Sequence, residues 1–218
     1  MNNLCADIGF KSINHEGEQL CGDHIDIIEN EDGSTIIVLA DGLGSGVKAS
    51  ILSTLTSKII STMISEGLSL ESCVDTIAKT LPICSVRGVA YSTFSIIYIK
   101  KNEEVELIQY DNPQIVFIRD GEVFDYPKID ESKCTECGKC LKVCSFDGKK
   151  IYKTQISIRE GDVITVMSDG CPHAGIGNSY NFGWDIKDIA DYIKVANIGG
   201  YTAKTISTML IDECYKLY

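Results

Sequence analysis

An apolar, strand-like run that ends in an aspartate and a glycine-rich turn occupies residues 34–46, Ser-Thr-Ile-Ile-Val-Leu-Ala-Asp-Gly-Leu-Gly-Ser-Gly. A second run of this kind, Val-Ile-Thr-Val-Met-Ser-Asp-Gly, occupies residues 163–170. The two runs predict that Asp41 and Asp169 each lie at the end of a buried strand, with an Asp-Gly turn behind. Carboxylate oxygens on rigid elements are the ligands that hard divalent cations prefer. The repeated pattern therefore predicts a metal site.

Length and charge narrow the class of protein. The chain has 218 residues, of which 44% are hydrophobic, and this is enough for one large globular domain. The net charge of −11 argues against a general affinity for nucleic-acid backbones or anionic membranes. The first residues lack the basic and apolar regions of a signal peptide, and no apolar run approaches the ~18 residues that span a bilayer. We therefore expect a cytoplasmic protein.

The hydrophobic pattern predicts the order of strands and helices. Residues 23–29 and 34–40 are apolar, β-branched runs separated by Glu-Asn-Glu-Asp-Gly, which is typical of a hairpin. From Gly46 to Gly67 apolar residues recur every four positions, which predicts a helix. Further helices are predicted at 70–80, 185–196 and 201–217, and further strands at 89–99, 104–110, 114–119, 122–126, 150–158 and 162–168.

Strands joined by short turns favour antiparallel sheets with helices packed outside them, which is an α+β fold. Residues 129–149 are polar and rich in lysine and cysteine, and they interrupt what would otherwise be one hairpin. We therefore predict a single domain over residues 1–218 with an inserted loop at 129–149.

Two more residues join the predicted acidic site. Asp23, in Cys-Gly-Asp-His, is a third carboxylate at the start of the strand next to 34–40. The carbonyl of Gly42 can reach a metal because no side chain crowds it. Bound Mn²⁺ or Mg²⁺ would lower the pKa of a water molecule and neutralise the charge of a phosphoryl group.

Four motifs together resemble those of one enzyme family. Residues 41–49, Asp-Gly-Leu-Gly-Ser-Gly-Val-Lys-Ala, followed by an apolar helix, resemble the metal-dependent serine/threonine protein phosphatases of type 2C, above all their stage II sporulation protein E branch. Gly22-Asp23 resembles an earlier motif of that family, and Tyr110-Asp-Asn-Pro-Gln to Arg119-Asp-Gly-Glu resembles its central hairpin. Residues 161–170 resemble its second metal motif.

The resemblance implies a four-layer α-β-β-α sandwich with a two-metal site, usually manganese, where metal-bound water attacks phosphoserine or phosphothreonine. Asp41 would bridge both metals, Gly42 would give a carbonyl and Asp169 would hold one metal. Asp23 would be a ligand or lie directly behind one. In the family a further acid follows the last helix, whereas this sequence stops at Tyr218 within that helix. Either the sequence is truncated there, or the site lacks an acid; we expect the last strand to be lacking and the second metal to bind weakly in this chain.

Four of the ten cysteines form a C-x₂-C-x₂-C-x₃-C run: Cys134, Cys137, Cys140 and Cys144. This is the spacing with which bacterial ferredoxins hold a [4Fe–4S] cluster. Structural zinc and unligated or redox-active thiols remain alternatives. Ferredoxins usually have a proline after the fourth cysteine, but the Cys-Pro of this chain is Cys171-Pro172. The fourth cluster ligand is therefore either Cys144 or a distant cysteine, for which Cys171 is the candidate. The alternative for Cys171 is that it is a small buried hydrophobic residue.

Two functions remain open at this point. The first is a Mn²⁺- or Mg²⁺-dependent protein serine/threonine phosphatase that acts on a phosphorylated regulatory protein and is regulated by an inserted [4Fe–4S] cluster. The second is a catalytically weak, phosphatase-like module for redox sensing or partner binding. A homodimer is left open in both cases.

Overall fold

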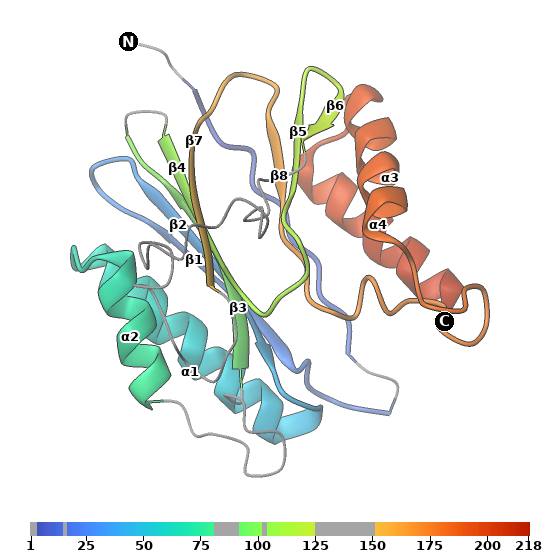
Figure 1. Ribbon diagram of the computed structural model, residues 1–218, viewed down its shortest axis with the longest axis horizontal. Coiled ribbons are helices and arrows are strands. Elements are labelled where there is room, and N and C mark those ends of the chain that lie inside the picture. Colours follow the sequence, from blue (N-terminus) through green and yellow to red (C-terminus); the bar gives the residue numbers. More distant parts are fainter. Residues whose placement is uncertain (1–3, 15–16, 81–91, 102–103, 125–150) are drawn as a thin grey trace, which may run out of the picture. The chain divides into compact units, whose positions relative to one another are not determined.

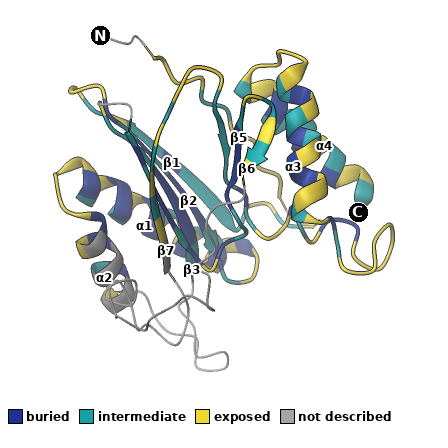
Figure 2. Cartoon of the chain, turned by 45° about the horizontal axis from the view of Figure 1, so that its top comes forward, coloured by how far each residue is buried: buried dark blue, intermediate teal, exposed yellow. Residues whose placement is uncertain are grey.

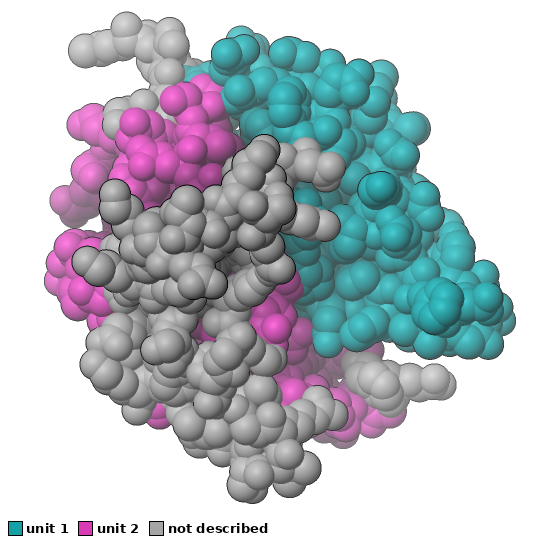
Figure 3. Space-filling model, viewed as in Figure 1, with its two compact units in different colours: residues 1–13, 113–128, 159–218 teal, residues 14–112, 129–158 magenta. Residues whose placement is uncertain are grey.

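The computed structural model describes residues 4–14, 17–80, 92–101, 104–124 and 151–218. The chain divides into two compact units, which are coloured separately in Figure 3. Unit 1 comprises residues 1–13, 113–128 and 159–218, and unit 2 comprises residues 14–112 and 129–158. The prediction of a single domain stays a prediction, and the cysteine-rich segment 129–149 lies outside the described residues.

Unit 2 contains a five-stranded antiparallel sheet with the order β1-β2-β3-β4-β7 (Figure 1). Its strands are β1 (Asp23–Glu29), β2 (Thr35–Gly42), β3 (Ser92–Ile99), β4 (Glu104–Tyr110) and β7 (Ile151–Ser157). The predicted β1–β2 hairpin is confirmed, and its turn is fixed by Asp32, whose side chain accepts hydrogen bonds from the backbone N–H and the hydroxyl of Ser34. Gly33 lies in this turn with a φ of +86°, which a residue with a Cβ rarely adopts.

Helices α1 (Gly46–Ser65) and α2 (Leu70–Thr80) cover one face of this sheet (Figure 1). Alternate residues of the central strands form the core beneath them, together with Ile60 and Ile64 of α1. On β2 these core residues are Ile36, Val38 and Ala40, all fully buried. Because successive strand residues point to opposite faces, Asp41 lies on the sheet face that is turned away from the helices.

Unit 1 contains a three-stranded antiparallel sheet, ordered β6-β5-β8, and two helices. The strands are β5 (Val116–Arg119), β6 (Glu122–Phe124) and β8 (Val163–Thr165), and the helices are α3 (Ile186–Ile198) and α4 (Ala203–Leu217). Val116 and Ile118 of β5 pack against the apolar faces of both helices, and the dark blue faces in Figure 2 show this burial. Between β5 and β8, the guanidinium of Arg119 donates to both oxygens of the Asp162 carboxylate at 2.8 and 2.6 Å.

The α+β fold with antiparallel sheets and packed helices is confirmed, as are the four predicted helices. One strand differs from its prediction: β8 ends at Thr165, so Asp169 does not lie at the end of a strand. Residues 166–168 lie outside any strand, and the chain then turns at Asp169, whose carbonyl accepts a hydrogen bond from the N–H of His173 at 3.0 Å. No helix among the described residues is long and apolar enough to span a membrane.

Candidate active site at the end of the five-stranded sheet

Asp23 and Asp41 are direct partners across the β1–β2 hairpin. Opposite residues of an antiparallel pair share one sheet face, with Cβ atoms ~4.5–5.5 Å apart. The two carboxylates therefore lie side by side on the face turned away from the helices. Asp23 is the first residue of β1, and Asp41 is the last residue but one of β2. Like charges placed directly opposite destabilise a sheet, and a cation between them removes that repulsion.

Gly42 completes this strand end, and its lack of a side chain is required there. A Cβ on Gly42 would lie 2.2 Å from the carbonyl oxygen of Ala49 in α1, which is far inside van der Waals contact. The N–H of Gly42 also donates to the carbonyl of Gly22 at 3.2 Å. The end of β2 is thus fixed between β1 and the first turns of α1, which pre-organises the backbone beside Asp41.

Helix α1 begins four residues after Gly42, with Ser45 as its N-cap. The Ser45 hydroxyl does not cap the helix but donates to the carboxylate of Glu18 at 3.1 Å. A helix N-terminus carries partial positive charge and unpaired N–H groups, which favours anions. The turn after Asp41 therefore brings an anion-favouring helix end next to the carboxylate pair.

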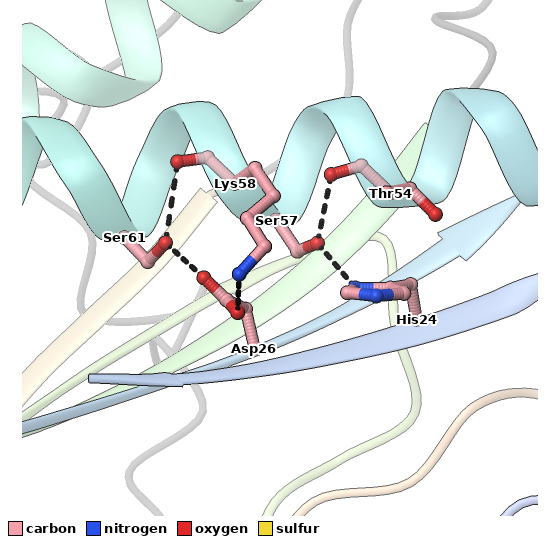
Figure 4. Close-up of polar contacts among 6 residues, drawn as sticks. All are labelled: His24, Asp26, Thr54, Ser57, Lys58 and Ser61. Atoms are coloured by element: carbon pink, nitrogen blue, oxygen red, sulfur yellow. Dashed lines mark hydrogen bonds and ion pairs between the residues drawn. The ribbon is translucent and has the colours of Figure 1, made fainter.

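On the other face of β1, polar side chains join the sheet to α1 (Figure 4). His24 Nδ1 lies 2.8 Å from the hydroxyl of Ser57, and the buried carboxylate of Asp26 accepts hydrogen bonds from Lys58 and Ser61. Burial raises the pKa of the Asp26 carboxyl, but these two hydrogen bonds, together with the positive charge of Lys58 and the influence of His24, hold the pKa below its usual value. The sequence analysis did not identify this network, although its signal is the alternation of His24 and Asp26 along one strand face.

Asp169 lies in unit 1, in the turn that follows β8. Its side chain is 65% exposed, and one of its oxygens lies 3.8 Å from Nδ1 of His173. The structure therefore brings Asp23 and Asp41 together within unit 2, whereas Asp169 is described within unit 1 alone.

Cys171 is buried in the core of unit 1, where its side chain is hydrogen-bonded to Cys214 of α4. This hydrogen bond holds the pKa of the Cys214 thiol below its usual value, against the opposing effect of burial. The predicted role of Cys171 as a cluster ligand stays a prediction. The four clustered cysteines (Cys134, Cys137, Cys140 and Cys144) lie outside the described residues.

The donors at the sheet end fit a hard divalent cation. Two neighbouring carboxylates and a fixed backbone carbonyl are oxygen ligands of the kind that Mg²⁺ and Mn²⁺ take. In the described part of the chain, no group of three or more His, Cys, Asp or Glu side chains is close enough to hold a metal ion. Asp23 and Asp41 could therefore supply some of the oxygen ligands of such a cation but not a complete set.

Comparison with known families identifies a match over most of the chain. The family model described as stage II sporulation protein E (SpoIIE) matches residues 31–213. No curated protein sequence matches this chain. The structure is similar to that of the PP2C phosphatase domain with a regulatory fragment of the cell fate determinant SpoIIE from Bacillus subtilis, with a TM-score of 0.70 and 18% identity. That similarity covers 96% of this chain and 58% of the Bacillus chain, so this chain spans less than two thirds of it.

Two further solved structures share the fold. The S. agalactiae serine/threonine phosphatase gives a TM-score of 0.66 at 16% identity, over 96% of this chain and 93% of that one. RsbX in complex with magnesium gives a TM-score of 0.58 at 20% identity, over 91% of this chain and 82% of that one. At these identities the likeness establishes the PP2C phosphatase fold, and function rests on the residues of the site.

Proposed function

We propose that this chain, which belongs to the stage II sporulation protein E family, is a metal-dependent protein serine/threonine phosphatase. The observation that carries the proposal is the carboxylate pair Asp23 and Asp41, which lies across one hairpin at the end of a sheet. The carbonyl of Gly42, the residue after Asp41, is proposed as a third oxygen ligand. The structurally similar RsbX was solved in complex with magnesium, which supports the choice of a hard cation.

Each residue has a distinct role in the proposed reaction. Asp41 would hold the metal ions, Gly42 would contribute its carbonyl oxygen, and Asp23 and Asp169 would contribute further carboxylate oxygens. When Mn²⁺ or Mg²⁺ is bound, it lowers the pKa of a water molecule and neutralises the charge on the phosphoryl group. The carboxylates would hold the cation, and the charge of the cation would attract the phosphate of the substrate.

The proposed substrate is a phosphoserine or phosphothreonine in a regulatory protein, in a cytoplasmic setting. The net charge of −11 disfavours nucleic acids and anionic membranes as partners, because their phosphates repel an acidic surface. A basic segment beside the phosphorylated residue would be attracted by the same charge.

The cysteine run adds a regulatory element to the proposal. Its C-x₂-C-x₂-C-x₃-C spacing supports a [4Fe–4S] cluster, with Zn²⁺ as the alternative metal. Anaerobic purification followed by iron, sulfide and zinc analysis separates the two. If Cys171 is the fourth ligand, C171S lowers the iron content and the visible absorbance of the cluster, whereas unchanged values would leave Cys144 in that role.

A kinetic experiment tests the enzyme assignment. The purified full chain is assayed for phosphate release from phosphoserine and phosphothreonine peptides, with Mn²⁺, with Mg²⁺ and with a chelator. We expect metal-stimulated hydrolysis that D41N lowers by about 100-fold or more, since the bridging oxygen loses its charge. D191N, which removes an exposed carboxylate on α3, is the matched control and retains activity. Metal-independent hydrolysis, or full activity of D41N, would contradict the assignment.

A further inference from the structure

The strand that follows β2 in the sheet places a hydroxyl beside the proposed cation site. Thr93 of β3 is the direct partner of Asp41, so the two side chains share the face turned away from the helices. Phe94 and Ile96, the neighbours that alternate with Thr93 and Ser95, belong to the core under α1 and α2, which confirms this orientation. The Thr93 side chain is therefore the neighbour of Asp41 on the side opposite Asp23.

A hydroxyl group beside a carboxylate normally donates its proton to it. A threonine has one such proton and two acceptor sites. Here the Thr93 hydroxyl donates to Oδ1 of Asn112 at 2.6 Å. Its single proton is thereby engaged, and it is unable to donate to Asp41 at the same time.

Asn112 lies two residues after the end of β4, and hydrogen bonds fix its position. It is buried, with 7% of its surface exposed, and its Nδ2 donates to the hydroxyl of Ser95 at 3.2 Å. Its backbone carbonyl accepts a hydrogen bond from Nε2 of Gln109 at 2.5 Å. The bonds with Thr93 and Ser95 hold the two ends of the side-chain amide, so that its oxygen faces Thr93, and the bond from Gln109 holds the backbone. The preceding residue, Asp111, has a φ of +53°, which shows how sharply the chain turns to place the amide there.

We propose that Asn112 is a positioning residue of the cation site: it takes up the proton of the Thr93 hydroxyl and so prevents that hydroxyl from competing with a cation for the Asp41 carboxylate. This inference rests on the proposed metal-dependent function. Asn112 would act on the cation site only by way of Thr93, and would contact neither metal nor substrate. Groups that orient metal ligands in this way commonly change metal affinity by ~10–100-fold when they are removed.

Mn²⁺ affinity, measured by calorimetry and by the electron paramagnetic resonance signal of free Mn²⁺, tests the proposal. N112A frees the Thr93 proton to bond Asp41, and we expect Mn²⁺ to bind roughly tenfold more weakly. T93V removes the hydroxyl, and we expect an affinity within about twofold of the wild type. The double variant N112A/T93V also lacks the competing proton and should bind Mn²⁺ nearly as tightly as the wild type.

A matched control uses the other hydrogen-bond partner of Asn112. Ser95 pairs with Leu39 rather than with an acid, so S95A removes a similar hydrogen bond without exposing Asp41 to a free hydroxyl. Because the Asn112 oxygen can still accept from Thr93 in S95A, we expect this variant to lose less Mn²⁺ affinity than N112A does. N112L, which fills the same space without an acceptor, replaces N112A if thermal unfolding shows that the alanine variant does not fold.

The outcomes separate this proposal from the proposed function. If N112A and N112A/T93V lose the same affinity, Asn112 acts only as a structural support and the proposal is overturned. If the wild type binds Mn²⁺ and the variants follow the predicted order but no phosphate is released, the phosphatase assignment alone fails. If the wild type binds no Mn²⁺, both fail.

Discussion

Asp26 gives the clearest test of how the sheet of unit 2 is joined to α1. The carboxylate is buried and accepts hydrogen bonds from Lys58, whose side chain is 59% exposed, and from Ser61, which is fully buried. We expect D26N, which keeps the shape but removes the charge, to destabilise the protein. The ion pair, whose lysine is mostly exposed, contributes up to ~1 kcal/mol, and replacing the charge-assisted bond to Ser61 by a neutral one costs about 1 kcal/mol more.

The total for D26N is therefore about 2 kcal/mol at pH 7, measured as the change in the free energy of urea unfolding. Because the pKa of Asp26 is lower in the folded protein, the stabilisation is present above the unfolded-state pKa of ~3.9. It is lost as the pH falls through the still lower folded-state value. The difference between wild type and D26N should stay constant from pH 7 to about pH 5 and shrink below about pH 4.

The variants S61A and K58M separate the contributions that Ser61 and Lys58 make to the loss of stability in D26N. K58M should cost less than 1 kcal/mol, since the lysine is mostly solvated. A D26N effect under about 0.5 kcal/mol at pH 7, or one that is equally large at pH 3, would refute the reasoning.

Two further substitutions test single contacts. G42A should cost about 1–3 kcal/mol, because its Cβ would lie 2.2 Å from the carbonyl oxygen of Ala49, whereas the control G170A, whose Cβ meets only one atom at 3.9 Å, should be tolerated. R119M should cost about 3 kcal/mol in unfolding free energy, because it leaves the buried carboxylate of Asp162 without its guanidinium; R119K should recover part of that loss. Equal stability of G42A and G170A, or of R119M and wild type, would contradict these contacts.

The sequence predicted α1 well but not which of its faces is buried. Apolar residues every four positions indicated a helix, yet Val47, Ile51 and Leu55 are 62%, 53% and 50% exposed. Ser57 and Ser61 are fully buried instead, because β1 presents His24 and Asp26 to that face of the helix. Hydrophobic periodicity records spacing within one element, and the polar partner on another strand is not part of that signal.

The candidate site could also be predicted only in part from the sequence. The position of Asp41 in its strand and its proximity to Asp23 followed from the hairpin pattern, since two adjacent strands with a short turn fix their own register. The predicted strand up to residue 168 was wrong at its end: β8 stops at Thr165, and residues 166–168 lie outside any strand, before the turn at Asp169. The contact of Asn112 with Thr93 joins residues that are 19 positions apart, and no local pattern predicts it.

A cation beside Asp23 and Asp41 is the central requirement of the proposed function. Crystals grown with Mn²⁺ and measured near the manganese absorption edge locate such an ion directly by its anomalous scattering. We predict a peak within direct coordination distance, about 2.0–2.2 Å, of the carboxylate of Asp41, and its loss in D41N. A fully occupied manganese ion elsewhere, or none at Asp41, would contradict the central claim.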